Sequence, residues 1–103
     1  MIRRIVKLTF QEDKVEDFKQ IFLDSKEKIV NMKGCYSVDL LQHKNQPNMF
    51  FTYSFWESED DLNNYRQSEL FGKTWKKTKA LFSDKPEAWS TEFVAGAKKV
   101  DEL

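Results

Sequence analysis

The sequence predicts a single α+β domain with the element order β-α-β-β-α-β. Segments in which apolar and polar residues alternate indicate strands, and longer segments with apolar residues every three or four positions indicate helices. The chain has 103 residues, of which 40% are hydrophobic and 33% charged, as in one globular domain without a linker. We expect this domain to span residues 1–95 and the small and charged residues 96–103 to form a tail.

The first strand and the first helix are predicted in the N-terminal third of the chain. Apolar and polar residues alternate loosely from Ile2 to Phe10, which indicates a strand. A helix is expected over about residues 13–32, because Asp13 and Glu16 have the spacing of a capping box and Gly34 is placed to end the helix. The residues of its buried side recur at helical spacing: Val15, Phe18, Phe22, Ser25 and Ile29.

A hairpin of two strands is expected next. Residues 35–43 and 49–56 both have the alternation of strands, and the segment between them, 44–48, contains the asparagines and the proline of a turn. The second strand of this hairpin is strongly aromatic and ends at Trp56.

Two capped helical segments and a last strand complete the order. Ser58 is a good N-cap and is followed by three acidic residues, which favour the positive end of a helix. Ser68 is placed to cap a second helical segment. Pro86 marks the end of helical structure, and residues 89–95 alternate as a strand. The residues expected on the inner side of these helices are Leu62, Tyr65, Phe71, Trp75, Thr78 and Phe82.

This order is the ferredoxin-like pattern, in which four antiparallel strands carry both helices on one face. Aromatic residues fall on both sides of the third strand, for example Phe50 and Phe51, so the face without helices remains partly apolar. A bare aromatic face is unfavourable in water, and a partner sheet is the usual way to cover it. We therefore expect a homodimer in which two sheets face each other.

Charge and residue usage exclude several classes of partner and site. Lysine and arginine total 17, as do aspartate and glutamate, so the net charge of +0 does not favour nucleic acid. A single cysteine, Cys35, and a single histidine, His43, exclude an internal disulfide framework and an ordinary His/Cys zinc site. No segment has the length and hydropathy of a membrane span or a signal peptide, so we expect a cytoplasmic protein without a membrane partner.

The region from Trp56 to Phe71 resembles the hallmark region of antibiotic-biosynthesis-monooxygenase-type domains. Such domains typically have a tryptophan that closes the third strand, an acidic helix start and a closing phenylalanine, and this chain has Trp56-Glu57-Ser58-Glu59 followed by Leu62, Tyr65, Ser68 and Phe71. The resemblance covers about residues 2–95. It implies a dimeric α/β barrel with a small-molecule pocket between the helices and the sheet of each subunit.

The chain also departs from the family pattern, at Tyr65, where a histidine is common. In the related heme-degrading branch, an asparagine, a tryptophan and a histidine build the site, and the matching positions here are Val6, Tyr65 and Trp75. Trp75 offers iron no ligand nitrogen, so heme degradation is not expected. The resemblance then implies oxygenation of an electron-rich aromatic substrate with no cofactor.

Five residues are candidates for such a site. Tyr65 and Trp75 are predicted catalytic residues that stack on a ring and donate hydrogen bonds, and His43 is a third because imidazole accepts a proton near neutral pH. Val6 and Phe71 join Tyr65 and Trp75 as predicted substrate-binding residues. The alternative is that these rings are plain core and that His43 is a solvated loop residue.

Two functions of different class therefore remain open. A cofactor-independent monooxygenase acting on a small aromatic or quinol-like substrate predicts a cavity of roughly 300 Å³ or more beside Tyr65 and Trp75. The alternative is a non-catalytic dimeric domain that binds a small ligand or is related to stress. This hypothesis predicts that the same rings fill the core. The volume of free space beside these two residues separates the two hypotheses.

Overall fold

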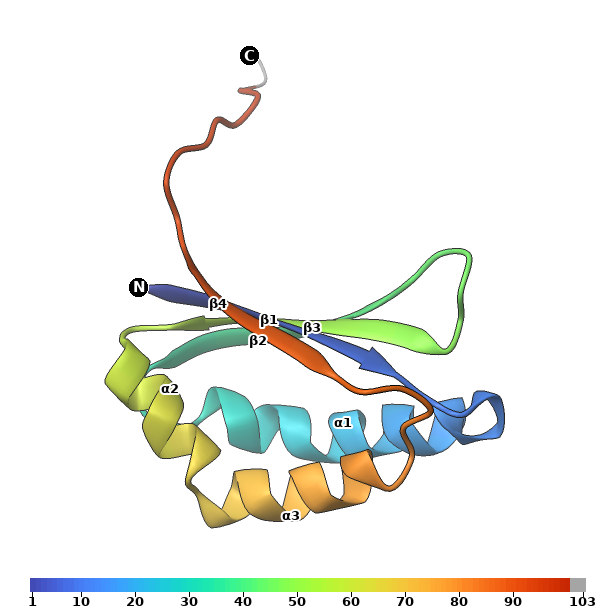
Figure 1. Ribbon diagram of the computed structural model, residues 1–103. Helices are drawn as coiled ribbons and strands as arrows, with labels where there is room; N and C mark the ends of the chain where they lie inside the picture. The colour runs from blue at the N-terminus through green and yellow to red at the C-terminus, as the bar shows by residue number, and fades with distance from the viewer. Residues whose placement is uncertain (101–103) are drawn as a thin grey trace.

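Four antiparallel strands form one sheet in the computed structural model, which describes residues 1–100. The strands are ordered β2-β3-β1-β4, and the helices lie together on one face of the sheet (Figure 1). This arrangement confirms the predicted α+β, ferredoxin-like fold. The strands are β1 (Ile2–Thr9), β2 (Cys35–Gln42), β3 (Met49–Trp56) and β4 (Glu87–Glu92), and the helices are the 3-10 turn η1 (Glu12–Lys14), α1 (Val15–Val30), α2 (Glu59–Arg66) and α3 (Glu69–Lys79).

Alternation along the two central strands sorts side chains between the two faces of the sheet. In β3, Phe50, Ser54 and Trp56 are buried under the helices, whereas Phe51 and Phe55 point to the opposite face and are only partly buried. Antiparallel pairing of β1 with β3 carries the same division onto β1. We call the side without helices the outer face; its residues on β1 are Arg3, Ile5, Lys7 and Thr9.

Two clusters of buried side chains make up the core between sheet and helices. The first contains Ile2, Ile29, Trp56 and Leu62. The second is mainly aromatic and is centred on Phe10, which is 0% exposed. The ring of Phe10 stacks on that of its neighbour in α1 at 4.1 Å between centroids and on that of Phe82 at 5.2 Å. The buried members of this second cluster are Leu8, Phe10, Phe18 and Phe50.

The predicted caps of the last two helices are confirmed, and that of the first is wrong. The hydroxyl of Ser58 accepts a hydrogen bond from the backbone N–H of Asp61, and that of Ser68 accepts one from Phe71, both at 3.1 Å. Asp13 instead lies within η1, and α1 begins after Lys14 without a side-chain cap. A short turn therefore takes the place of the predicted capping box.

The first helix is also shorter than the predicted residues 13–32, because it ends at Val30. Gly34 lies further on, in the turn before β2, so it is not the residue that ends the helix. Its φ of 81° is nevertheless the left-handed conformation that favours glycine. Its carbonyl accepts a hydrogen bond from the backbone N–H of Glu57 at 2.7 Å, which ties this turn to the end of β3.

The last strand is placed earlier than predicted. Instead of residues 89–95, β4 covers Glu87–Glu92 and pairs with β1 from Lys7 opposite Glu87 to Ile2 opposite Glu92. Since β1 begins at Ile2, the described residues after Glu92, 93–100, have no partner strand. The strands β1 and β2 each end one residue before the predicted end. Of the predicted tail, residues 96–100 have no regular structure, and residues 101–103 lie outside the described part of the chain.

The outer face is rich in exposed apolar side chains, as the sequence predicts. Leu41 is 52% exposed, Trp89 45% and Phe93 58%. The guanidinium of Arg3 lies between two rings, 4.7 Å from the centroid of Phe55 and 4.5 Å from that of Phe93. No second layer covers this face in Figure 1.

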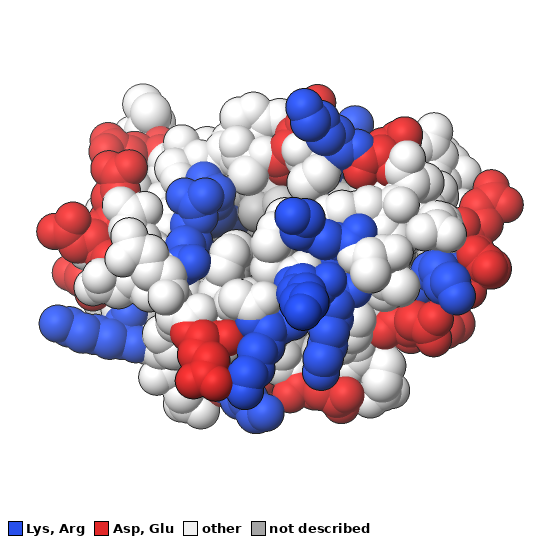
Figure 2. All heavy atoms as spheres, turned by 60° about the horizontal axis from the view of Figure 1, so that its bottom comes forward, with Lys and Arg blue, Asp and Glu red and all other residues white. Residues whose placement is uncertain are grey.

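On the helical side of the molecule, basic and acidic side chains occupy different regions. Basic side chains gather across its middle, with acidic side chains mainly toward both ends (Figure 2). All four lysines of α3 are exposed there, as expected for a solvated face: Lys73, Lys76, Lys77 and Lys79. No helix within residues 1–100 is long and apolar enough to cross a membrane.

Candidate functional site

A cavity of about 270 Å³ lies between the sheet and the helices. Its wall includes four of the five predicted site residues, Val6, Tyr65, Phe71 and Trp75. The volume is just below the roughly 300 Å³ set for a ligand site. The region beside Tyr65 and Trp75 is therefore open space rather than a solid core.

A series of ring contacts, from the end of β3 through α2 to α3, forms the aromatic wall of this cavity. Tyr65 stacks on Trp56 with centroids 5.0 Å apart, and its edge meets Phe71 at 5.2 Å. Phe71 in turn stacks nearly parallel on Trp75 at 5.7 Å and 11°. The caps at Ser58 and Ser68 start the two helices at the positions that bring these rings together.

Neither the Tyr65 hydroxyl nor the Trp75 indole N–H has a hydrogen-bond partner within residues 1–100, and both side chains are half-buried. In the same part of the chain, no fully buried side-chain nitrogen or oxygen lacks a partner. The Tyr65 hydroxyl and the Trp75 indole N–H must therefore reach accessible space. Both are free to donate a hydrogen bond to a ligand.

Trp56 differs from these two residues. It is 1% exposed, and its indole N–H donates to the hydroxyl of Ser54 at 3.0 Å. Its polar group is thus already used inside the core, which supports a structural role for this residue.

Burial strongly changes the acidity of the phenol in the wall. The pKa of Tyr65 rises from 10.0 to about 12, first because burial penalises the phenolate and then because Cys35 lies nearby. Tyr65 is therefore a neutral hydrogen-bond donor at physiological pH and not a base.

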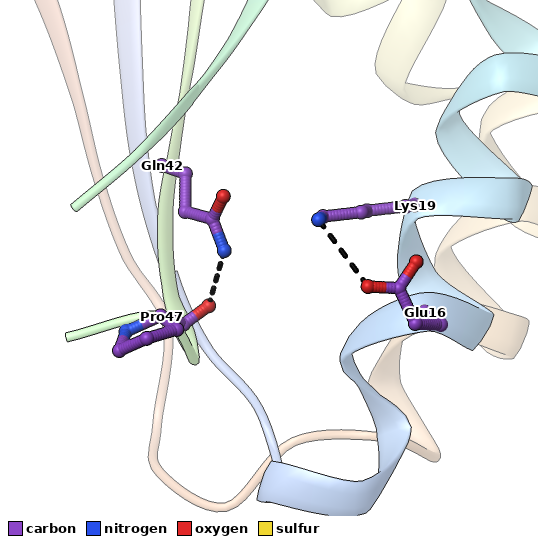
Figure 3. A network of polar contacts seen from close by, with 4 residues as sticks. All are labelled: Glu16, Lys19, Gln42 and Pro47. Atoms are coloured by element: carbon purple, nitrogen blue, oxygen red, sulfur yellow. Dashed lines mark hydrogen bonds and ion pairs between the residues drawn. The ribbon is translucent and has the colours of Figure 1, made fainter. Parts of the chain in front are cut away.

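His43, the fifth predicted site residue, does not line the cavity. Its Nδ1 accepts hydrogen bonds from the backbone N–H groups of Asn45 and Gln46, both at 3.1 Å. The same turn is held by the amide of Gln42, which donates to the carbonyl of Pro47 at 2.8 Å (Figure 3). In this structure His43 shapes the β2–β3 turn.

Two arginines line the cavity that were not among the predicted site residues. Arg4 on β1 points to the helical side, and its guanidinium donates to the hydroxyl of Ser90 at 3.0 Å. Arg66 is the last residue of α2 and is exposed. The pKa of Arg4 is lowered, mainly by burial and then by the positive charge of Arg66. The signal in the sequence was the charge of Arg4 in the middle of an otherwise apolar strand face.

The chemical groups in the wall are unusual for an enzyme site. Of the described residues that line the cavity, none is an aspartate, glutamate, histidine, cysteine or lysine. Two wall hydroxyls, those of Ser25 and Thr78, donate to carbonyls of their own helices at 2.8 Å. Within residues 1–100, no three His, Cys, Asp or Glu side chains gather to hold a metal ion. The wall thus offers apolar surface, neutral donors and two positive charges.

Comparison with solved structures finds the same fold in several proteins. A protein of Nitrosomonas europaea, provisionally named an antibiotic biosynthesis monooxygenase, is 18% identical, with 92% of this chain and 100% of that chain covered at a TM-score of 0.85. A protein with the same provisional name from Caulobacter crescentus CB15 is 21% identical, with 91% and 90% covered and a TM-score of 0.85. A conserved protein of Methanosarcina mazei Go1 is 19% identical, with 87% and 89% covered and a TM-score of 0.84.

These identities show a shared fold and nothing finer. No protein of curated function matches the sequence. The sequence pattern of the family described as "Antibiotic biosynthesis monooxygenase" matches residues 1–77, which is most of the chain and includes β1 to α2 and nearly all of α3. The chain therefore belongs to the antibiotic biosynthesis monooxygenase family.

Proposed function

We propose that this protein is a monooxygenase that oxidises a small aromatic or quinol-like molecule in the cavity between sheet and helices, without a bound cofactor. The observation that carries the proposal is the cavity of about 270 Å³ with two unpaired donors, the Tyr65 hydroxyl and the Trp75 indole N–H. Membership of the family supports the reaction class.

The proposed reaction needs only an electron-rich substrate and dioxygen. In an anthrone-type substrate, an activated ring CH₂ group loses a proton, and the resulting carbanion passes an electron to dioxygen. After the two radicals combine, one oxygen atom remains as a carbonyl and the other leaves as water. The balance is CH₂ + O₂ → C=O + H₂O, so the substrate supplies all four electrons.

The protein would contribute orientation and exclusion of water. Phe71 and Trp75 lie nearly parallel and offer flat surface for a ring, with Val6 on the sheet side of the cavity. Tyr65, which stays protonated, would donate to an oxygen of the substrate as negative charge develops there.

We also propose that the protein is a homodimer joined through the outer faces of its sheets. The exposed rings of Trp89 and Phe93, together with Leu41, support this arrangement because a large apolar patch on a monomer is unfavourable in water.

Oxygen uptake measured with a panel of anthrone- and quinol-type compounds tests the reaction. We expect substrate-dependent uptake above the rate of spontaneous oxidation, and a loss of about tenfold or more in kcat/KM for Tyr65→Phe, since one donor to a developing charge is removed. Trp75→Phe should weaken the reaction similarly. Tyr53→Phe, which removes a phenol hydroxyl from the outer face, is the matched control and should react as the wild type does.

The absence of uptake by the wild-type protein across a broad panel would refute the enzymatic proposal. Binding of the same compounds without uptake would instead identify the protein as a non-catalytic ligand-binding domain.

A further inference from the structure

We propose that Arg4 and Arg66 together bind an anionic oxygen of the ligand, so that the cavity selects a flat apolar ring system carrying a carboxylate or an ionised ring hydroxyl. The inference rests on the proposed function in that it assigns the same cavity to a ligand. It adds the charge of that ligand, which the reaction class does not specify.

The first support is the charge of the wall. Arg4 and Arg66 both line the cavity, whereas none of the described lining residues is acidic. Two positive charges beside apolar surface, with no negative charge in the wall, attract an anion much more strongly than they would in bulk water.

The second support is that neither arginine has a counterion among residues 1–100. The ion pairs formed within residues 1–100 are Lys19 with Glu16 and Lys73 with Glu69, and neither involves these two side chains. The hydrogen bond from Arg4 to Ser90 leaves most of its five N–H donors free. A guanidinium with free donors matches the geometry of a carboxylate or a phenolate oxygen.

The position of Arg4 is the third support. This residue lies on the helical side of β1, and its guanidinium is half-buried there although its neighbour Arg66 repels it. Exposed lysines of α3 add to the positive surface of the same side of the molecule (Figure 2). A bound anion would relieve this repulsion between the two guanidinium groups.

No described residue of the wall can act as a base, so the positive charge of the two arginines would serve to favour the ionised form of the substrate. Tyr65 is protonated at neutral pH, and none of the described lining residues offers a carboxylate or an imidazole to accept a proton. The substrate must therefore lose its proton to water or enter already ionised. Two arginines would favour the ionised form by stabilising its oxygen.

Binding of a matched pair of probes tests the inference without any turnover. 2-Naphthoate and 2-naphthamide have nearly the same shape and differ in charge, and isothermal titration calorimetry measures both affinities. We expect the wild type to bind naphthoate at least about tenfold more tightly than naphthamide, as charge-assisted hydrogen bonds would give. Added salt should weaken the binding of naphthoate only.

Variants locate the effect on the two arginines. Arg4→Met should weaken naphthoate about tenfold, and Arg66→Met about threefold because Arg66 is more exposed, while naphthamide changes less than twofold for each. Lys77→Met removes the same charge from an exposed site that does not line the cavity, and it should leave both affinities unchanged. Circular dichroism checks that each variant is folded.

The absorbance of 4-nitrophenol distinguishes the two sources of the anion. If binding raises the ionised fraction of the dye at fixed pH, and Arg4→Met loses this effect, the arginines bind an ionised ring oxygen. If naphthoate alone binds selectively, they bind an appended carboxylate. Either result supports the inference.

Equal affinity of the wild type for naphthoate and naphthamide, no binding of either, or unchanged naphthoate affinity in both folded arginine variants would overturn it. Selective binding of naphthoate in a protein that consumes no oxygen would leave this inference standing while the proposed reaction fails.

Discussion

Replacing Gly34 by alanine should destabilise the protein by about 2–3 kcal/mol. The φ of 81° at this residue costs a residue with a side chain about 1–2 kcal/mol. A Cβ at this position would also overlap the side chain of Asp61, lying 2.6 Å from its Cβ. If the aspartate moves away, it loses the hydrogen bond that it accepts from the Ser58 hydroxyl at 3.1 Å, which costs about 1 kcal/mol more.

Gly72→Ala is the matched control, because the same substitution there should have the opposite effect. Gly72 lies within α3, and nothing lies within 4 Å of a Cβ built on it. Alanine should stabilise the helix by up to about 1 kcal/mol, since glycine is a poor helix former.

Urea unfolding followed by circular dichroism, at one fixed protein concentration, measures both changes in the free energy of unfolding. In an Asp61→Ala background the Ser58–Asp61 hydrogen bond is already absent, so Gly34→Ala should cost about 1 kcal/mol less there than in the wild type, although the Cβ of residue 61 still lies 2.6 Å from the new Cβ. A Gly34→Ala protein within about 0.5 kcal/mol of the wild type would refute the reasoning, since that is the range of an ordinary surface substitution.

Two further predictions concern assembly and pH. Light scattering at micromolar concentration should give a dimer mass for the wild type and a monomer mass for Trp89→Glu. Leu23→Glu, at an exposed site on α1, is the control and should remain a dimer. A monomeric wild type would contradict the argument from the outer face. The pKa of Tyr65 is about 12 in the folded protein and 10.0 in the reference state, so the unfolded chain loses the phenol proton first as pH rises. The free energy of unfolding should therefore fall between pH 10 and pH 12, by about 2–3 kcal/mol in all. Urea unfolding across that range should show a smaller fall for Tyr65→Phe, and an identical fall in both proteins would count against the burial of the phenol.

The sequence was sufficient for those features that depend on neighbouring residues. The caps at Ser58 and Ser68 were predicted correctly because each serine bonds to a backbone N–H three residues along the chain. Asp13 has the same local signal, but a bond from the Lys14 N–H to the Gln11 carbonyl forms a turn there first. The last strand was misplaced for a different reason, because its end is set by the length of β1 rather than by its own alternation.

The candidate site was only partly predictable. Tyr65 and Trp75 were placed on the inner side of their helices by spacing alone, and the structure puts both in the wall of the cavity. The volume of that cavity depends on how closely the helices approach the sheet, and periodicity does not report this distance. Arg4 was visible as a charge on the buried face of a strand, but its meaning required Arg66, which α2 brings near it from 62 positions away.

Alternation along β1 has a consequence for how proteins of this fold diversify. Arg4 and Val6 face the cavity, whereas Arg3 and Ile5, their immediate neighbours, face the outer side of the sheet. Substitutions at even-numbered positions can thus alter which ligand is accepted while odd-numbered positions preserve the surface available to a partner. An insertion of one residue would exchange the two sets at once, so point substitution, and not insertion, is the route by which this strand can acquire a new ligand without losing its other surface.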